Sequence, residues 1–188
     1  MTDAPVIRKA AMPDIRSIAA LINSYAVEAI MLSRTEFELA ESIRDFTVAS
    51  AGGVVAGCGA LQIYTPDSAE IRSLAVRPDL ERSGLGRRIV ERLEVEAREF
   101  EIASLFAFTY VPEFFSGMGF EEVDRDHIPL KAWKDCLRCP KFKACDEIAV
   151  VKSLGKSVGT SAAPPIEGDS AYTSRPRATL LSVLPILR

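Results

Sequence analysis

The feature that most constrains the fold is a strand that runs directly into a glycine-containing turn and then into a helix. Residues 69–76 have the composition and the flanking turn residues of a strand. The turn that follows contains Gly84 and Gly86, and the next residues carry apolar side chains at helical spacing: Ile89, Leu93, Ala97 and Phe100. A strand, a turn and a helix in this order predict an α/β protein with helices packed on a sheet.

Strand-like and helix-like segments alternate along the rest of the chain between Val6 and Val151. A β-hairpin is predicted around the glycine pair at 52–53, because β-branched residues flank it. Helices are predicted from Pro13 and, in short form, from near Pro112. Strands are predicted at residues 6–9, 46–50, 54–64, 69–76, 102–109, after 120, and at 147–152. The fold class is therefore α/β (α+β).

A second helix is predicted from Ser33 to about Asp45. Ser33 and Glu36 have the spacing of a capping box, in which each side chain bonds the other residue's backbone N–H. The helix that begins there would bury a stripe of three residues: Phe37, Ala40 and Ile43.

One folded domain is expected over residues 1–152, followed by a tail over residues 153–188. The chain of 188 residues is long enough for one well-buried core. From Ser153 to about Ala178, Gly, Ser, Pro and Thr dominate, and they bury too little apolar surface to offset the entropy of ordering. We therefore expect a disordered tail, whose apolar end at 180–187 either docks or stays unstructured.

Charge and hydropathy argue against several kinds of partner. A net charge of −3 is too small to favour a nucleic-acid surface, which is normally basic. No run approaches the roughly 20 apolar residues that span a bilayer, and the N-terminus has no apolar signal core. We expect a cytoplasmic protein with a small-molecule substrate, and a homodimer is left open.

The glycine turn has the features of an anion site. Gly84 and Gly86 open a helix whose first N–H groups are unpaired, and the absence of side chains lets a pyrophosphate approach them. Arg82, Arg87 and Arg88 add positive charge. On spacing alone, a plain strand-to-helix turn is an equally good interpretation. A dinucleotide-binding fingerprint is excluded, because its third glycine and its acidic residue are missing.

Residues 81–86, GluArgSerGlyLeuGly, resemble the acetyl-CoA loop of the GNAT superfamily of N-acetyltransferases. That loop has Gln or Arg, two variable residues, Gly, one variable residue, and Gly or Ala; here Glu81 takes the first position. Further segments are similar to the acetyltransferase domain of N-acetylglutamate synthases, particularly the short bacterial forms: residues 31–35, 69–76, 108–115, 119–124 and 139–149. The resemblance covers about residues 5–152.

This resemblance implies a GNAT fold, with a mixed, mostly antiparallel central sheet flanked by helices. It also implies acetyl-CoA as the cosubstrate, with no metal. The cofactor contacts that it assigns lie on the strand at 69–76 and on the glycine turn: Leu74, Ala75, Val76, Arg82, Ser83, Gly84, Leu85, Gly86 and Arg87.

Acetyl transfer from a thioester to an amine needs a base for the amine and a proton for the departing thiolate. The resemblance assigns the base to Glu70, acting through water; a solvent-facing strand carboxylate is the alternative. It assigns the acid to Thr109 or Tyr110, because Phe115 stands where many related enzymes carry a tyrosine. The alternatives are a strand hydroxyl for Thr109 and a core aromatic for Tyr110.

A glutamate acceptor has two carboxylates, which planar, bidentate cations bind well. By resemblance, Arg34, just inside the second predicted helix, binds the substrate carboxylate, and Lys143 is a second basic residue. Backbone N–H groups near Ser73 are further candidates. The alternative for each cation is a solvated surface charge.

Three cysteines, Cys136, Cys139 and Cys145, have a spacing that can bind zinc, with His127 or Cys58 as the fourth ligand. The second Cys-x2-Cys pair of a full zinc site is missing from the sequence. Thiols that line a loop over the substrate are therefore the favoured interpretation, and no metal is expected.

The leading hypothesis is an enzyme that acetylates the α-amine of L-glutamate by direct attack in a ternary complex, a step of arginine synthesis by resemblance. One alternative changes the acceptor to another amino acid, a polyamine or a protein N-terminus. A second is a non-catalytic regulator that binds acetyl-CoA. A third is a metal-dependent interaction module centred on the cysteines.

Overall fold

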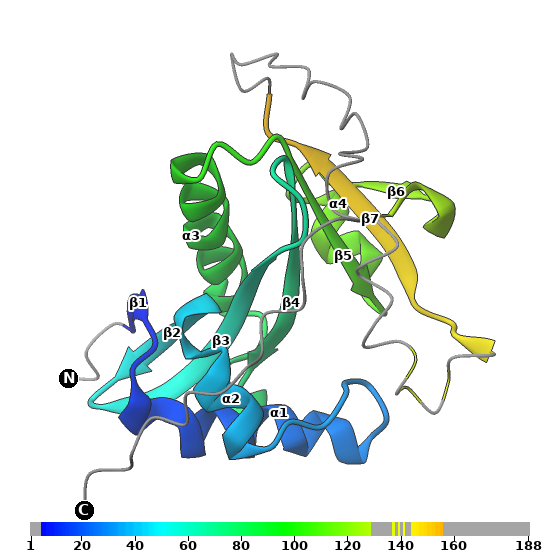
Figure 1. Cartoon of the computed structure of the whole chain (residues 1–188). Coiled ribbons are helices and arrows are strands. Elements are labelled where there is room, and N and C mark those ends of the chain that lie inside the picture. The colour runs from blue at the N-terminus through cyan, green and yellow to red at the C-terminus, as the bar shows by residue number, and fades with distance from the viewer. Residues whose placement is uncertain (1–4, 129–136, 138, 140, 142–143, 156–188) are drawn as a thin grey trace, which may run out of the picture. The chain divides into compact units, whose positions relative to one another are not determined.

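The computed structural model describes residues 5–128, 137, 139, 141 and 144–155 (Figure 1). The strands are β1 (Val6–Lys9), β2 (Phe46–Ala51), β3 (Val54–Ile63), β4 (Ser68–Val76), β5 (Ser104–Thr109), β6 (Glu121–Val123) and β7 (Ile148–Ser153). The α-helices are α1 (Ile15–Val27), α2 (Glu36–Glu41), α3 (Leu85–Glu99) and α4 (Pro112–Ser116). Short 3-10 helices are η1 (Met12–Asp14), η2 (Ile43–Asp45), η3 (Pro78–Leu80) and η4 (Arg125–His127). The tail expected from residue 153 falls mainly on residues outside this description.

The strands form one sheet in the order β1-β2-β3-β4-β5-β7-β6. Every neighbouring pair is antiparallel except β4 and β5, which are parallel. The parallel pair is joined through α3, because a parallel connection needs a crossover. This is the mixed, mostly antiparallel sheet that the resemblance to GNAT acetyltransferases implied.

Helices cover both faces of the sheet (Figure 1). The α3 side chains Ile89 and Leu93 are fully buried on one face, and Ile18 and Ile22 of α1 on the other. In β3, Ala60 belongs to the core beside α1 and Leu61 to the core beside α3, as the period of two along a strand requires. None of the helices in the described part of the chain combines the length and apolarity that crossing a lipid bilayer requires.

The second helix begins later than the sequence predicted. Thr35, not Ser33, is the N-cap, and its capping box pairs it with Glu38. The shift changes the buried stripe, so that Leu39 is fully buried and Phe37 is 72% exposed. The prediction was wrong because two overlapping capping boxes, two residues apart, both fit the sequence.

Strand β4 parts from β5 after Glu70 and then contains a bulge opposite β3. Cys58 pairs with Ala75 and Ala60 with Arg72, so Gly59 alone stands opposite Ser73 and its neighbour. The pairing of β4 with β5 runs only from Ser68 to Glu70, and beyond that point the two strands diverge (Figure 1). The sheet is therefore open between the second half of β4 and the end of β5.

Replacing Gly59 by alanine should destabilise the fold by about 1–3 kcal/mol, because the added methyl group overpacks the core under α3. Its Cβ would lie 2.9 Å from Ile89 Cγ2 and 3.3 Å from Leu93 Cδ1. Gly117→Ala is the matched control, since its Cβ would meet nothing closer than 3.5 Å. Urea unfolding measures the free energy of unfolding of each variant. Equal values for the two variants would contradict the prediction that a methyl group at residue 59 overpacks the core.

Candidate functional site

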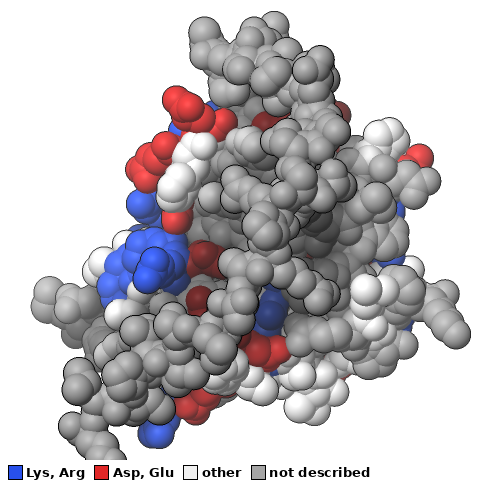
Figure 2. Space-filling model, viewed as in Figure 1, with Lys and Arg blue, Asp and Glu red and all other residues white. Residues whose placement is uncertain are grey.

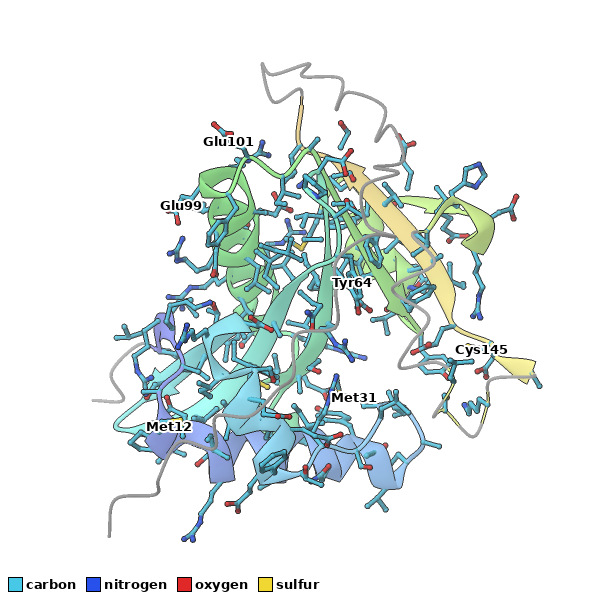
Figure 3. All side chains as sticks on the ribbon, in the orientation of Figure 1. Met12, Met31, Tyr64, Glu99, Glu101 and Cys145 are labelled. Atoms are coloured by element: carbon cyan, nitrogen blue, oxygen red, sulfur yellow. The ribbon has the colours of Figure 1, made fainter. Side chains whose placement is uncertain are left out.

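A cleft of about 1300 Å³ opens where β4 and β5 part. Both strands border it, together with the segment before α2, the start of α3 and the segment before β7. Met31 and Cys145, labelled in Figure 3, come from distant parts of the chain and both border this cleft. The cleft therefore collects residues from segments that lie far apart in the sequence, between Tyr25 and Glu147.

The N-terminus of α3 presents bare backbone amides at the cleft. Gly84 is the N-cap, in the left-handed region with φ +82°, and no side chain caps the helix. The space where a Gly84 Cβ would stand is open, with nothing within 4 Å. The first backbone hydrogen bond into the helix runs from Arg88 N–H to the Gly84 carbonyl, which leaves the preceding amides available to an anion.

Seven of the nine expected cofactor contacts border the cleft: Leu74, Ala75, Val76, Arg82, Gly84, Gly86 and Arg87. The other two do not. Ser83 donates its hydroxyl to the Leu80 carbonyl, and the Leu85 side chain is buried in the core. Of the arginines, Arg87 also binds the Gly117 carbonyl, and Arg88 binds the Pro5 carbonyl away from the cleft.

Glu70 is the last β4 residue that pairs with β5, so its carboxylate lies at the narrow end of the opening. The residue is 8% exposed and borders the cleft. Tyr64 donates a hydrogen bond of 3.0 Å to Glu70 Oε2, and Arg72 Nη1 lies 3.7 Å from the same atom. Glu70 is thus a buried carboxylate at the cleft, held by a tyrosine hydroxyl and close to a guanidinium.

The bulge gives Ser73 an unusual backbone conformation. Its φ is +52°, in the left-handed region, which costs free energy for a residue with a side chain. Its carbonyl accepts a hydrogen bond from the buried Cys58 thiol, so this carbonyl points towards β3. Ser73 and Leu74 both border the cleft, and neither takes part in the regular ladder with β3. The bulge thus removes this stretch of backbone from sheet pairing next to Glu70.

Thr109 and Tyr110 follow each other where β5 ends, and both border the cleft. Thr109 is 6% exposed, and its Oγ1 accepts a hydrogen bond of 3.0 Å from the Val111 N–H. A threonine hydroxyl that accepts one bond still has its hydrogen to donate. This leaves Thr109 able to give a hydrogen bond to a group in the cleft.

The Tyr110 hydroxyl belongs to a small polar cluster. It donates to Asp146 Oδ1 at 2.8 Å and accepts from Lys141 Nζ at 3.1 Å. Burial raises the pKa of Tyr110, an effect that the Lys141 hydrogen bond opposes and the Asp146 hydrogen bond reinforces. Because its hydrogen is already given to Asp146, Tyr110 is the weaker of the two candidate proton donors.

Arg34 borders the cleft from the segment before α2. The Asn23 side chain of α1 binds its backbone twice, accepting from the Arg34 N–H and donating to its carbonyl, each at 2.9 Å. Arg34 precedes the Thr35 N-cap, so its expected position inside the helix was wrong. The Asn23 clamp, rather than the helix, fixes the backbone that carries this guanidinium.

The expected cysteine cluster is only partly within the described residues. Cys136 and Lys143 lie outside them, whereas Cys139 and Cys145 both border the cleft. Among the described side chains, no three His, Cys, Asp or Glu residues are grouped to hold a metal ion. Cys58 is fully buried in the core beside α1, where burial raises its pKa to about 12. It cannot serve as a ligand at the cleft.

Four polar side chains in or next to the cleft were not predicted from the sequence: Tyr64, Arg72, Arg125 and Glu147. Arg125 Nη2 lies 2.9 Å from Cys145 Sγ, and the guanidinium lies 5.8 Å from the centre of the Phe108 ring. Burial raises the pKa of Glu147, and the Cys145 thiol and Arg125 oppose that rise. Glu70 and Arg72 are two residues apart on β4, so the alternation of side chains along a strand could have predicted that they lie on the same face. The sequence of η4 and of the segment before β7 has no pattern that would have predicted the positions of Arg125 and Glu147.

Lys and Arg side chains lie next to Asp and Glu side chains on the face shown in Figure 2. The described part of the chain also contains close ion pairs, such as Arg8 with Asp14 and Lys9 with Glu96, each at 2.7 Å. Opposite charges in these pairs neutralise one another in part.

The sequence of this chain is similar to those of known acetyltransferases. Residues 13–120 match the acetyltransferase (GNAT) family. An uncharacterized N-acetyltransferase of Chlorobaculum tepidum is 43% identical over 148 residues, which make up 79% of this chain and 96% of that protein. An amino-acid acetyltransferase of Mycobacterium tuberculosis is 34% identical over 137 residues, 71% of this chain and 78% of that protein.

Two solved structures have folds similar to that of this chain. N-acetylglutamate synthase from Neisseria gonorrhoeae, complexed with coenzyme A and N-acetyl-glutamate, superposes with a TM-score of 0.74 and 30% identity. The match covers 81% of this chain and 35% of the gonococcal chain. A Mycobacterium tuberculosis protein in complex with CoA superposes with a TM-score of 0.70 and 30% identity, over 80% of this chain and 99% of that chain.

Proposed function

This chain belongs to the GNAT family of acetyltransferases, and from that premise we propose that it transfers the acetyl group of acetyl-CoA to the α-amine of L-glutamate. Family membership makes acetyl-CoA the cosubstrate. The observation that carries the proposal is one cleft that holds the bare α3 amides, the Glu70 carboxylate and Arg34 together. These are a diphosphate site, a base and a carboxylate-binding cation.

The reaction proceeds by direct attack in a ternary complex. The acceptor amine attacks the thioester carbonyl carbon, an N–C bond forms, and Glu70 removes the ammonium proton through a water molecule. Backbone N–H groups of the bulge at Ser73 stabilise the negative oxygen of the tetrahedral intermediate. The C–S bond then breaks, and Thr109 gives its hydrogen bond to the departing thiolate.

The choice of L-glutamate rests on charge and on the named relatives. Arg34 supplies the planar donor that a carboxylate binds in bidentate fashion, and Arg125 is a further guanidinium in the same cleft. An amino-acid acetyltransferase and an N-acetylglutamate synthase are among the proteins to which this chain is similar. Both observations favour a dicarboxylic acceptor over a polyamine.

Arg34→Ala should raise KM for L-glutamate by about tenfold or more, because a charge-assisted bidentate contact is lost, while KM for acetyl-CoA changes little. The assay is CoA release across a panel of amino acids, polyamines and N-terminal peptides. Arg16→Ala is the matched control, since Arg16 is 88% exposed on α1 and lies outside the cleft. An unchanged KM for glutamate contradicts the role of Arg34.

The same panel separates the alternatives. Turnover with another amine and none with glutamate would change the acceptor but keep the enzyme class. Acetyl-CoA binding without turnover on any amine would make the chain a regulator rather than an enzyme.

A further inference from the structure

A tyrosine from α1 connects two parts of the cofactor side of the cleft. The Tyr25 hydroxyl lies 2.5 Å from the Val76 carbonyl, at the end of β4, and 2.7 Å from Glu81 Oε1. Both partners are acceptors, so the single phenol hydrogen is shared between them. All three residues border the cleft.

Glu81 stands at the start of the turn that leads to the anion site. It follows η3 and precedes Gly84 by three residues, and it also borders the cleft. A carboxylate at this place has the same sign of charge as the diphosphate that the α3 amides would bind. Like charges within several ångströms repel, and the repulsion is strongest at low salt.

The hydrogen bond gives the Glu81 carboxylate a fixed position. Tyr25 of α1 holds it beside the Val76 carbonyl, at the end of β4. Burial, with help from Glu81, raises the pKa of Tyr25 to about 12, so the phenol keeps its hydrogen at neutral pH. The contact therefore persists under the conditions in which an acetyltransferase works.

We propose that Tyr25 is a positioning residue that keeps the Glu81 carboxylate turned away from the diphosphate of acetyl-CoA. The inference rests on the proposed binding of acetyl-CoA at the α3 N-terminus. It explains how an acidic residue near that site is compatible with binding of the diphosphate. Tyr25 acts through Glu81 and touches no reacting atom.

Tyr25→Phe releases the carboxylate, and we expect the dissociation constant for CoA and KM for acetyl-CoA to rise about three- to tenfold at low ionic strength. The turnover number kcat should stay within about twofold, because the reacting atoms are untouched. Titration calorimetry with CoA alone needs no acceptor, so it tests binding independently of glutamate. Raising the salt concentration should shrink the effect, as expected for charge repulsion between exposed groups.

The decisive variant is Tyr25→Phe combined with Glu81→Gln, which should return the CoA affinity to within about twofold of the wild type, because the repelling charge is gone. Asp79→Asn is the matched charge control: Asp79 lies in the same turn, paired with Arg77, and does not border the cleft. It should leave the affinity unchanged. Acetyl-pantetheine, which lacks phosphates, should have the same KM with wild type and Tyr25→Phe.

A double variant that stays weak, or acetyl-pantetheine weakened as much as acetyl-CoA, would mean that Tyr25 only supports packing, and would overturn the proposal. If Tyr25→Phe does not fold, Glu81→Asp replaces it, since the shorter side chain keeps the charge but loses its reach to Tyr25. It should show the same loss of affinity, and unchanged affinity counts against the proposal. Wild-type protein that does not bind CoA would instead refute the proposed function itself.

Discussion

Glu70→Gln is expected to lower kcat by about 10²- to 10⁴-fold, the range over which a positioned general base acts. Glutamine keeps the size of the side chain and an oxygen that can accept the Tyr64 hydrogen bond, so the fold of β4 should be preserved. The variant loses the ability to take a proton from the acceptor, together with the negative charge that faces Arg72. Steady-state CoA release at saturating substrates measures kcat, and CoA binding by calorimetry should stay within about twofold.

Glu147 provides the sharpest comparison for this experiment. It borders the same cleft, and its pKa is raised by burial, so it is another carboxylate that could act as a base. Its neighbours differ, however, because Cys145 Sγ lies 3.7 Å from its Oε2 and Arg125 binds its carbonyl. We expect Glu147→Gln to cost less than about tenfold in kcat. A larger loss with Glu147→Gln than with Glu70→Gln would reassign the base.

Gly84→Val should raise KM for acetyl-CoA by about 10- to 100-fold, because charge-assisted bonds to the phosphates are worth about 1.5–3 kcal/mol each. A side chain at this position would occupy the open space in front of the α3 amides. It would also strain the backbone, since φ is +82° and β-branched residues disfavour that region. Initial rates at varied acetyl-CoA give KM, and CoA calorimetry checks it.

Gly53→Val separates the loss of binding from the strain. Gly53 lies in the β2–β3 turn with φ +80°, and a Cβ there also meets nothing within 4 Å. The two variants therefore share backbone strain and open surroundings, but only Gly84 borders the cleft. Gly53→Val should lose a similar free energy of unfolding and keep KM for acetyl-CoA. A raised KM in both variants would trace the effect to global stability.

Most of the fold could be predicted because its signals are local. The glycine pair fixes the β2–β3 hairpin, and the strand, turn and helix around Gly84 occur where the sequence placed them. The start of α2 could not be fixed, since the Ser33 and Thr35 capping boxes overlap and only packing of Leu39 in the core selects one. Tertiary contacts decide between two locally equivalent helix starts.

Some residues of the candidate site could likewise be predicted from the sequence, whereas their contacts could not. Glu70, Thr109 and Arg34 were named from resemblance, and all three border one cleft, although their roles stay predictions. The partners of Glu70 depend on the β3–β4 pairing and its bulge, which periodicity alone does not reveal. Arg125 reaches Cys145 only through the packing of η4 against the segment before β7, so sequence spacing gave no indication of it.

The parting of β4 and β5 leaves two strands that face each other without a ladder, in the interior of the sheet rather than at its rim. Unsatisfied backbone groups at such an inner border are satisfied by water or by an extended molecule that carries amides of its own. A ligand lying there would act as a missing strand and complete the hydrogen bonding between the two halves. Binding of a ligand between β4 and β5 would then also make the protein more rigid, because the ligand joins the two halves of the sheet.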